Sequence, residues 1–135
     1  MSEHDDRCPC GSGDAYDDCC GRYLTDSRLA PTAEALMRSR YTAFATGDVD
    51  YLLATWHPST RPDELELDEH MRWRRLDVLA TDAGGPWDDA GSVEFVAQYR
   101  IDDGTSAGQR GRLHETSRFV REGGRWLYVD GDVGS

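Results

Sequence analysis

Residues 32–61, TAEALMRSRYTAFATGDVDYLLATWHPSTR, decide the fold because they hold two amphipathic helical patterns joined at a glycine. Apolar residues recur at helical spacing through residues 33–44, and a second stripe with the same period covers residues 49–56. Gly47 is suited to ending the first helix, and Asp48 is suited to capping the second. We therefore expect two helices whose apolar faces must be covered by another layer.

Arg40 lies inside the apolar stripe of the first helical pattern. A guanidinium keeps its proton, so a buried arginine needs a carboxylate or another hydrogen-bonding partner beside it. Glu115 is a candidate partner, because it shares a strand face with Leu113 and Phe119. We expect either an ion pair that joins helix to sheet or a polar patch inside a pocket.

The C-terminal half supplies the covering layer. Alternating apolar residues predict strands, and Glu122-Gly123-Gly124-Arg125 predicts a hairpin turn. The expected strands fall in the ranges 76–80, 93–101, 113–119 and 126–129. Helices that precede turn-linked strands indicate an α+β fold with an antiparallel sheet. The acidic residues 62–71 are expected to form one short helix.

Length and charge narrow the classes of protein to be considered. A chain of 135 residues fits one domain with a small appendage. The net charge of −11 argues against a nucleic-acid partner, and no apolar run approaches the roughly 20 residues that cross a bilayer. The acidic N-terminal segment is unlike a secretory signal, so we expect a cytoplasmic protein whose thiols stay reduced.

The cysteines of the sequence all lie in its first twenty residues, at Cys8, Cys10, Cys19 and Cys20. Four clustered thiols in a reducing compartment favour a closed, tetrahedral zinc site with four sulfur ligands. A disulfide-stapled tip and a redox pair in the CPC segment are the alternatives. Adjacent cysteines count against disulfides, because the short loops are geometrically difficult.

A second group of side chains could carry chemistry. The helical half contributes cations and the sheet contributes carboxylates: Arg40, His57, Arg61, Glu94 and Glu115. In one interpretation they line a pocket, with His57 or Glu115 as general base and Arg40 as anion clamp. In the other, Arg40 and a carboxylate form a structural ion pair and His57 only caps a helix end.

Aromatic residues could line the same pocket or could simply fill a small core. The candidates are Tyr41, Trp56, Phe119, Trp126 and Tyr128, with Tyr51 and Phe95 as further members.

The segment CPCGSGDAYDDCCGRY, residues 8–23, resembles the SEC-C motif, a small zinc-binding element also found in the SecA translocation ATPase. Four later segments resemble the YchJ family: LMRSRYTAF (36–44), DYLLATWHPSTR (50–61), VEFVAQY (93–99) and LHETSRFVREGGRWLYVDGD (113–132). The resemblance implies a zinc-binding element at residues 1–24, with the cysteines as ligands. It also implies a nuclear-transport-factor-2-like cone at residues 25–135, in which a curved sheet wraps helices and leaves a pocket.

Two functions follow as expectations. In the first, the protein is a binding or adaptor module: the zinc element recognises a protein partner and the cone holds a small-molecule ligand. In the second, the cone is an enzyme of the acid–base isomerase, hydratase or hydrolase type, which rests on analogy of fold alone.

Overall fold

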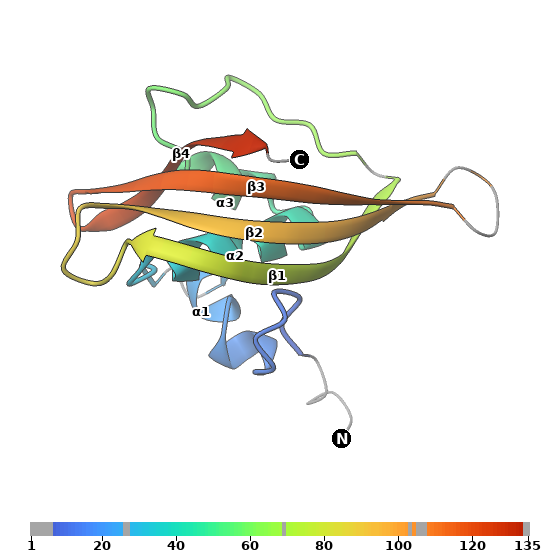
Figure 1. Ribbon diagram of the computed structural model, residues 1–135, viewed down its shortest axis with the longest axis horizontal. Coiled ribbons are helices and arrows are strands. Elements are labelled where there is room, and N and C mark those ends of the chain that lie inside the picture. The colour runs from blue at the N-terminus through green and yellow to red at the C-terminus, as the bar shows by residue number, and fades with distance from the viewer. Residues whose placement is uncertain (1–6, 26–27, 69, 103, 105–107, 134–135) are drawn as a thin grey trace.

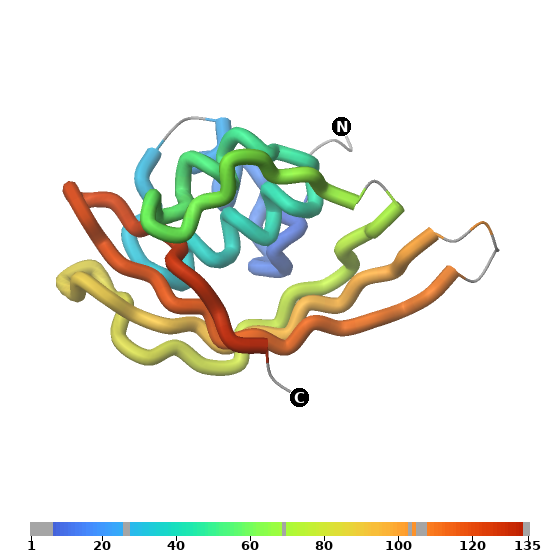
Figure 2. The backbone as a smooth tube through the Cα atoms, turned by 90° about the horizontal axis from the view of Figure 1, so that it is seen from above, coloured from blue at the N-terminus to red at the C-terminus, as the bar shows by residue number. Residues whose placement is uncertain are grey.

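The computed structural model describes residues 7–25, 28–68, 70–102, 104 and 108–133. Its elements are η2 (Tyr16–Asp18), α1 (Gly21–Leu24), α2 (Ala33–Thr46), α3 (Val49–Ala54), β1 (Met71–Ala83), β2 (Ala90–Ile101), β3 (Gln109–Glu122) and β4 (Arg125–Val133). The strands form one antiparallel sheet in the order β1-β2-β3-β4 (Figure 1). The sheet bends into an arc with the helices on its concave side (Figure 2). The expected α+β class with a curved antiparallel sheet is therefore confirmed.

The two expected helices form where the sequence predicts them, and a side chain caps the start of each. The hydroxyl of Thr32 accepts a hydrogen bond from the backbone N–H of Ala35 at 3.0 Å and so caps the start of α2. Gly47 ends α2 with φ of 82°, a left-handed conformation that glycine adopts without strain. The carboxylate of Asp48 then caps α3 through the N–H of Tyr51.

The register of the sheet is interrupted by bulges that decide which side chains face the helices. Trp73 pairs with Tyr99 and Leu76 pairs with Ala97, so one extra residue lies between them on β1. Trp73 and Leu76 consequently face the same side, although an odd spacing in a regular strand would place them on opposite sides. Another bulge between Arg118 and Phe119 keeps Phe119 opposite Tyr128 on that same inner face.

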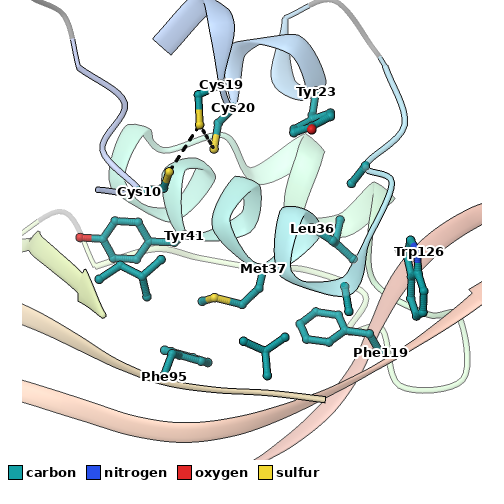
Figure 3. Packing of buried hydrophobic residues seen from close by; sticks show 14 of the residues in the cluster. Cys10, Cys19, Cys20, Tyr23, Leu36, Met37, Tyr41, Phe95, Phe119 and Trp126 are labelled. Atoms are coloured by element: carbon teal, nitrogen blue, oxygen red, sulfur yellow. Dashed lines mark hydrogen bonds between the residues drawn. The ribbon is translucent and has the colours of Figure 1, made fainter. Parts of the chain in front are cut away.

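Helix α2 lies between the N-terminal element and the sheet, so it is covered on two sides (Figure 3). Leu36 and Met37 are buried on the side of α2 that faces the sheet, where they belong to the same packed cluster as Phe95 and Phe119. The cysteines belong to the same buried cluster, on the opposite side of the helix. One core thus joins the element, the helix and the sheet.

The prediction of a short helix in residues 62–71 is wrong for the residues of this segment that the structure describes. Residues 62–68 contain no helix, and β1 already begins at Met71. The segment has few apolar residues to bury, so no packing against the core offsets the entropy of ordering a short helix. Among the described residues, no helix is both long and apolar enough to cross a bilayer.

Candidate functional site: a cysteine cluster and a cone cavity

The sulfur atoms of Cys8, Cys10, Cys19 and Cys20 all lie within 4.8 Å of one another, and the four residues are buried. The Sγ of Cys10 is 3.6 Å from that of Cys19, which is 4.0 Å from that of Cys20 (Figure 3). A disulfide requires about 2.05 Å, and all four cysteines are free thiols. Metal–sulfur bonds of about 2.3 Å in a tetrahedron place the sulfurs about 3.8 Å apart. The donor set therefore fits a metal ion.

The chemistry of the thiols supports the same conclusion. Burial raises the pKa of Cys19, and hydrogen bonds with Cys10 raise the pKa of Cys20. Hydrogen bonds with Cys10 and Cys20 lower the pKa of Cys8. Four buried sulfurs cannot all ionise unless a cation compensates them, so a bound metal would resolve their competition for protons.

The cysteine element is attached to α2 by polar contacts as well as by packing. The Sγ of Cys8 lies 3.6 Å from the hydroxyl oxygen of Thr42. Nη1 of Arg38 donates to the backbone oxygen of Cys10 at 3.0 Å. These contacts connect the cysteine element directly to α2, the helix that packs on the inner face of the sheet.

A cavity of about 240 Å³ lies between part of α2 and the inner face of the sheet. Its lining is mostly aromatic and aliphatic: Met37, Arg40, Tyr41, Phe44, Trp56, Trp73, Phe95, Ala97, Leu113, Glu115, Ser117, Phe119 and Tyr128. Arg40 and Glu115 are the charged residues among them. The helices and the sheet thus enclose an apolar space with one cation and one carboxylate in its wall.

Arg40 is buried, as its place in the apolar stripe predicted, but its partners differ from the expected carboxylate. Its Nη1 donates to the backbone oxygen of Leu52 at 2.8 Å and to the hydroxyl of Thr55 at 2.7 Å. Its guanidinium also lies 5.1 Å from the ring centroid of Trp56 and 4.6 Å from that of Tyr128. Burial lowers its pKa to about 10, so the group stays protonated near neutral pH.

The predicted ion pair between Arg40 and a carboxylate is therefore wrong within the described residues. Carbonyl and hydroxyl oxygens at the end of α3 take the place of a carboxylate, which suits a cation at a helix C-terminus. Glu115 instead accepts a hydrogen bond from the hydroxyl of Ser117 at 2.7 Å. Arg40 and Glu115 therefore both line the cavity and do not form an ion pair with each other.

Backbone pairing between the end of α3 and β4 holds the aromatic residues around Arg40. The N–H of His57 donates to the oxygen of Tyr128 at 2.7 Å, and the N–H of Tyr128 donates to the oxygen of Thr55 at 2.8 Å. The rings of Trp56 and Tyr128 consequently meet edge to face, with centroids 5.1 Å apart. Burial raises the pKa of Tyr128 to about 12.

Three of the ionisable residues expected in the pocket lie elsewhere. Nε2 of His57 lies 2.8 Å from a carboxylate oxygen of Glu122, outside the cavity. Arg61 is exposed on a separate shallow hollow. Glu94 faces the outer side of the sheet, where it lies 2.7 Å from Nε2 of His114. The backbone bond of His57 to Tyr128 and the strand alternation at Glu94 account for two of these positions, and none of the three residues lines the cavity.

Four of the five predicted aromatic residues line the cavity: Tyr41, Trp56, Phe119 and Tyr128. Trp126 is buried but lies beside a different hollow of about 170 Å³, and its indole N–H donates to the backbone oxygen of Pro31 at 3.3 Å. Trp126 therefore links β4 to the segment just before α2 and does not line the cavity.

The sequence interpretation missed Trp73, although this residue lines the cavity. Its ring contacts those of Tyr41, Phe44 and Tyr99 at centroid distances of 6.0, 6.2 and 5.4 Å. The bulge at Arg74 turns it inward, and a simple alternation pattern gives no sign of that bulge. Arg72-Trp73-Arg74, an isolated aromatic residue between cations, was the one available signal.

Comparisons with known proteins agree with this architecture. Residues 6–22 match the model of the SEC-C motif, and residues 32–131 match the model described as YchJ, middle NTF2-like domain. A UPF0225 protein of Chromobacterium violaceum is 56% identical over 93% of this chain and 92% of its own length. A UPF0225 protein of Streptomyces coelicolor is 51% identical, with 93% and 94% of the two chains covered.

Two solved structures share the fold. The solution structure of a SEC-C motif containing protein from Rhodopseudomonas palustris is 39% identical with a TM-score of 0.79, covering 95% of this chain and 98% of that one. The crystal structure of a SEC-C motif containing protein from Psychrobacter arcticus is 27% identical with a TM-score of 0.73, covering 95% and 82%. With a SEC-C motif ahead of an NTF2-like domain, and relatives at this level of identity, the chain belongs to the YchJ (UPF0225) family.

Proposed function

We propose that this protein is a binding module whose cone cavity holds a small organic molecule, and whose cysteine cluster holds a zinc ion that fastens the N-terminal element to α2. The observation that carries the proposal is the apolar cavity of about 240 Å³ with Arg40 and Glu115 separate in its wall. Protein interiors are normally close-packed with few voids, so a space of this size between helix and sheet needs a reason. Apolar concave spaces with a few convergent polar groups are the usual form of ligand sites.

A binding role is better supported than catalysis. Among the described residues that line the cavity there is no histidine or cysteine. Ser117 directs its hydroxyl to Glu115, and His57, the expected base, is engaged outside. Tyr41 and Tyr128 are the other groups in the cavity wall that could transfer a proton, but burial raises the pKa of both to about 12, far from the near-neutral value that suits acid–base catalysis. The geometry therefore favours holding a ligand over transforming it.

Zinc is the proposed metal because four buried cysteine sulfurs within 4.8 Å of one another could ligate one ion, and closed sites with four cysteine ligands are typical of structural zinc. Such a site requires reduced thiols, in keeping with the cytoplasmic location that we propose. Native mass spectrometry of freshly purified protein should give one zinc per chain. A metal-free protein with two disulfides would contradict this part of the proposal.

The cavity can be tested through the tryptophan side chains, because the sequence contains four. Trp56 and Trp73 line the cavity, whereas Trp87 is 91% exposed on the β1–β2 turn and serves as an internal control. The zinc-loaded protein with isotope-labelled tryptophan should be titrated with para-propenylphenol, a flat neutral probe. We expect the indole N–H signals of Trp56 and Trp73 to shift and that of Trp87 to stay. Unmoved cavity signals at millimolar probe would contradict ligand binding.

The recognition of a partner protein by the zinc element stays a prediction. The cysteines face α2 and the core, so only the outer side of the element is free for such a contact.

A further inference from the structure

We infer that the ligand of the cone cavity is a flat aromatic carboxylate that also carries a hydroxyl group. This inference rests on the proposed function and adds the chemical class of the ligand. Three features of the wall carry it: the size and aromatic character of the space, the unused hydrogen-bond donors of Arg40, and the separate acceptor Glu115.

The size of the cavity limits the ligand to one substituted ring or a small conjugated system. An apolar cavity of about 150 Å³ takes up benzene, and this cavity measures about 240 Å³. The rings of Trp73, Tyr41 and Tyr99 meet edge to face in one part of the wall and its surroundings. Trp56 and Tyr128 meet in the same way in another part. Walls of this kind offer ring faces and edges to a flat aromatic group.

Arg40 supplies the anchor for a carboxylate. It is 5% exposed, and both of its hydrogen bonds within the described part of the chain come from Nη1. The N–H groups on Nε and Nη2 remain, and these form the edge of a guanidinium that pairs with a carboxylate through two parallel bonds. The contacts to Leu52 and Thr55 fix the group in place, so little side-chain entropy is lost on binding.

Glu115 supplies an acceptor for a donor on the ligand. Its carboxylate accepts one hydrogen bond, from Ser117, whereas an ionised carboxylate has room for several. Gly131 leaves space for it: a Cβ at that position would lie 2.1 Å from Oε2 of Glu115. The carboxylate is thus accommodated on the inner face of the sheet, where an unpaired charge is costly.

The two charges together select the ligand. A carboxylate without a hydroxyl would satisfy Arg40 but would cover Glu115 without giving it a hydrogen-bond donor. A phenol without a carboxylate would satisfy Glu115 and leave the free edge of Arg40 unpaired. A molecule that carries both groups satisfies both residues.

Three related probes separate these contributions: para-coumarate, which carries both groups, cinnamate, which lacks the hydroxyl, and para-propenylphenol, which lacks the carboxylate. Calorimetric titration of the zinc-loaded protein should show para-coumarate binding about tenfold more tightly than either of the others. Glu115→Gln replaces the charged acceptor of the ligand's hydroxyl with a neutral amide, so para-coumarate should lose most of its advantage and its preference over cinnamate should fall below about threefold. Glu94→Gln is the matched control, because Glu94 lies on the outer face, and it should leave the preference unchanged.

Each contrary result has one meaning. If para-propenylphenol binds as tightly as the two acids, the inference about ligand class is wrong while the binding function stands. If Glu115→Gln leaves the preference for para-coumarate over cinnamate intact, Glu115 does not accept a hydrogen bond from the ligand's hydroxyl and the inference is wrong. The same holds if Glu94→Gln lowers this preference as much as Glu115→Gln does. If none of the three probes binds and the indole signals of Trp56 and Trp73 stay unmoved, the binding function itself is contradicted.

Discussion

The Sγ of Cys8 lies 3.6 Å from the hydroxyl of Thr42, on a side of α2 that does not contribute to the cavity. Met37, Arg40, Tyr41 and Phe44 line the cavity from the same helix. The cysteine cluster and the cavity are therefore separated by the width of one helix.

Removal of the proposed zinc should destabilise the cone as well as the N-terminal element. Without a cation the buried thiols must hold protons, and the packing of the cysteines on α2 loosens. We expect a chelator to lower the melting temperature and to broaden the indole signal of Trp73, which packs on Tyr41 and Phe44. Calorimetry and the indole spectrum measure the two effects. An unchanged melting temperature in the metal-free protein would show that the element is not part of the core.

Replacement of Arg40 by leucine should destabilise the fold. The change leaves the oxygens of Leu52 and Thr55 without their donor and leaves Glu115 without a compensating positive charge. We expect a loss of about 2–4 kcal/mol in the free energy of unfolding by urea. Adding Glu115→Gln should recover part of that loss.

Arg75→Leu is the control for Arg40, because Arg75 is exposed on β1 and pairs with Asp77 there. It should change the free energy of unfolding by no more than about 0.5 kcal/mol. Equal effects of the Arg40 and Arg75 changes would mean that the buried guanidinium contributes nothing specific.

Gly131→Ala should displace the Glu115 side chain. The added methyl group would overlap Oε2 and Cδ of Glu115, so the carboxylate must move away from its present place beside the hydroxyl of Ser117. We expect destabilisation that disappears when Glu115 is also changed to alanine. A double-mutant cycle by urea unfolding measures this, with a coupling of about 1 kcal/mol or more as the expected result. Additive effects would place the Glu115 carboxylate away from Gly131.

Alkaline pH should weaken the fold through its buried tyrosines. Burial raises the pKa of Tyr41, Tyr51 and Tyr128 from 10 to about 12. Between these values the unfolded chain loses phenol protons that the folded chain keeps, so stability falls as pH rises from about 10 to 12. Arg40 acts in the opposite direction, because burial lowers its pKa to about 10, but one arginine opposes three tyrosines.

Absorbance of tyrosinate in folded and urea-unfolded protein checks the shift directly, and urea unfolding at a series of pH values checks the stability. Ionisation of all tyrosines at the same pH in both states would contradict the burial of these three rings.

The sequence predicts the architecture well wherever local patterns decide it. Thr32, Gly47 and Asp48 mark the helix ends by their side-chain or backbone chemistry, and the turn at residues 122–125 joins β3 to β4 as expected. The cysteine cluster is also readable, because four potential ligands within thirteen residues can meet with little loop entropy. The boundary between the element and the cone at residue 24 stays a prediction.

The cavity is less predictable because its wall depends on long-range geometry. Arg40 is recognisable as a buried cation from its place in the stripe, but only tertiary packing brings the end of α3 to it in place of a carboxylate. Trp73 enters the wall through a bulge that alternation cannot foresee. His57 lies outside the cavity because its backbone pairs with β4 and its ring contacts Glu122.

Helix α2 contacts the cysteine element on one side and the sheet on the other, and it precedes the strands in the sequence. This order matters during synthesis on the ribosome. The cysteines and α2 leave the exit tunnel before any strand does, so a nascent chain can assemble this local unit, with its proposed metal, first. The N-terminal element can then cover one side of α2 early, so that only the side facing the sheet stays exposed until the strands pack on it. We expect metal starvation during translation to produce aggregates more readily than metal removal from the finished protein.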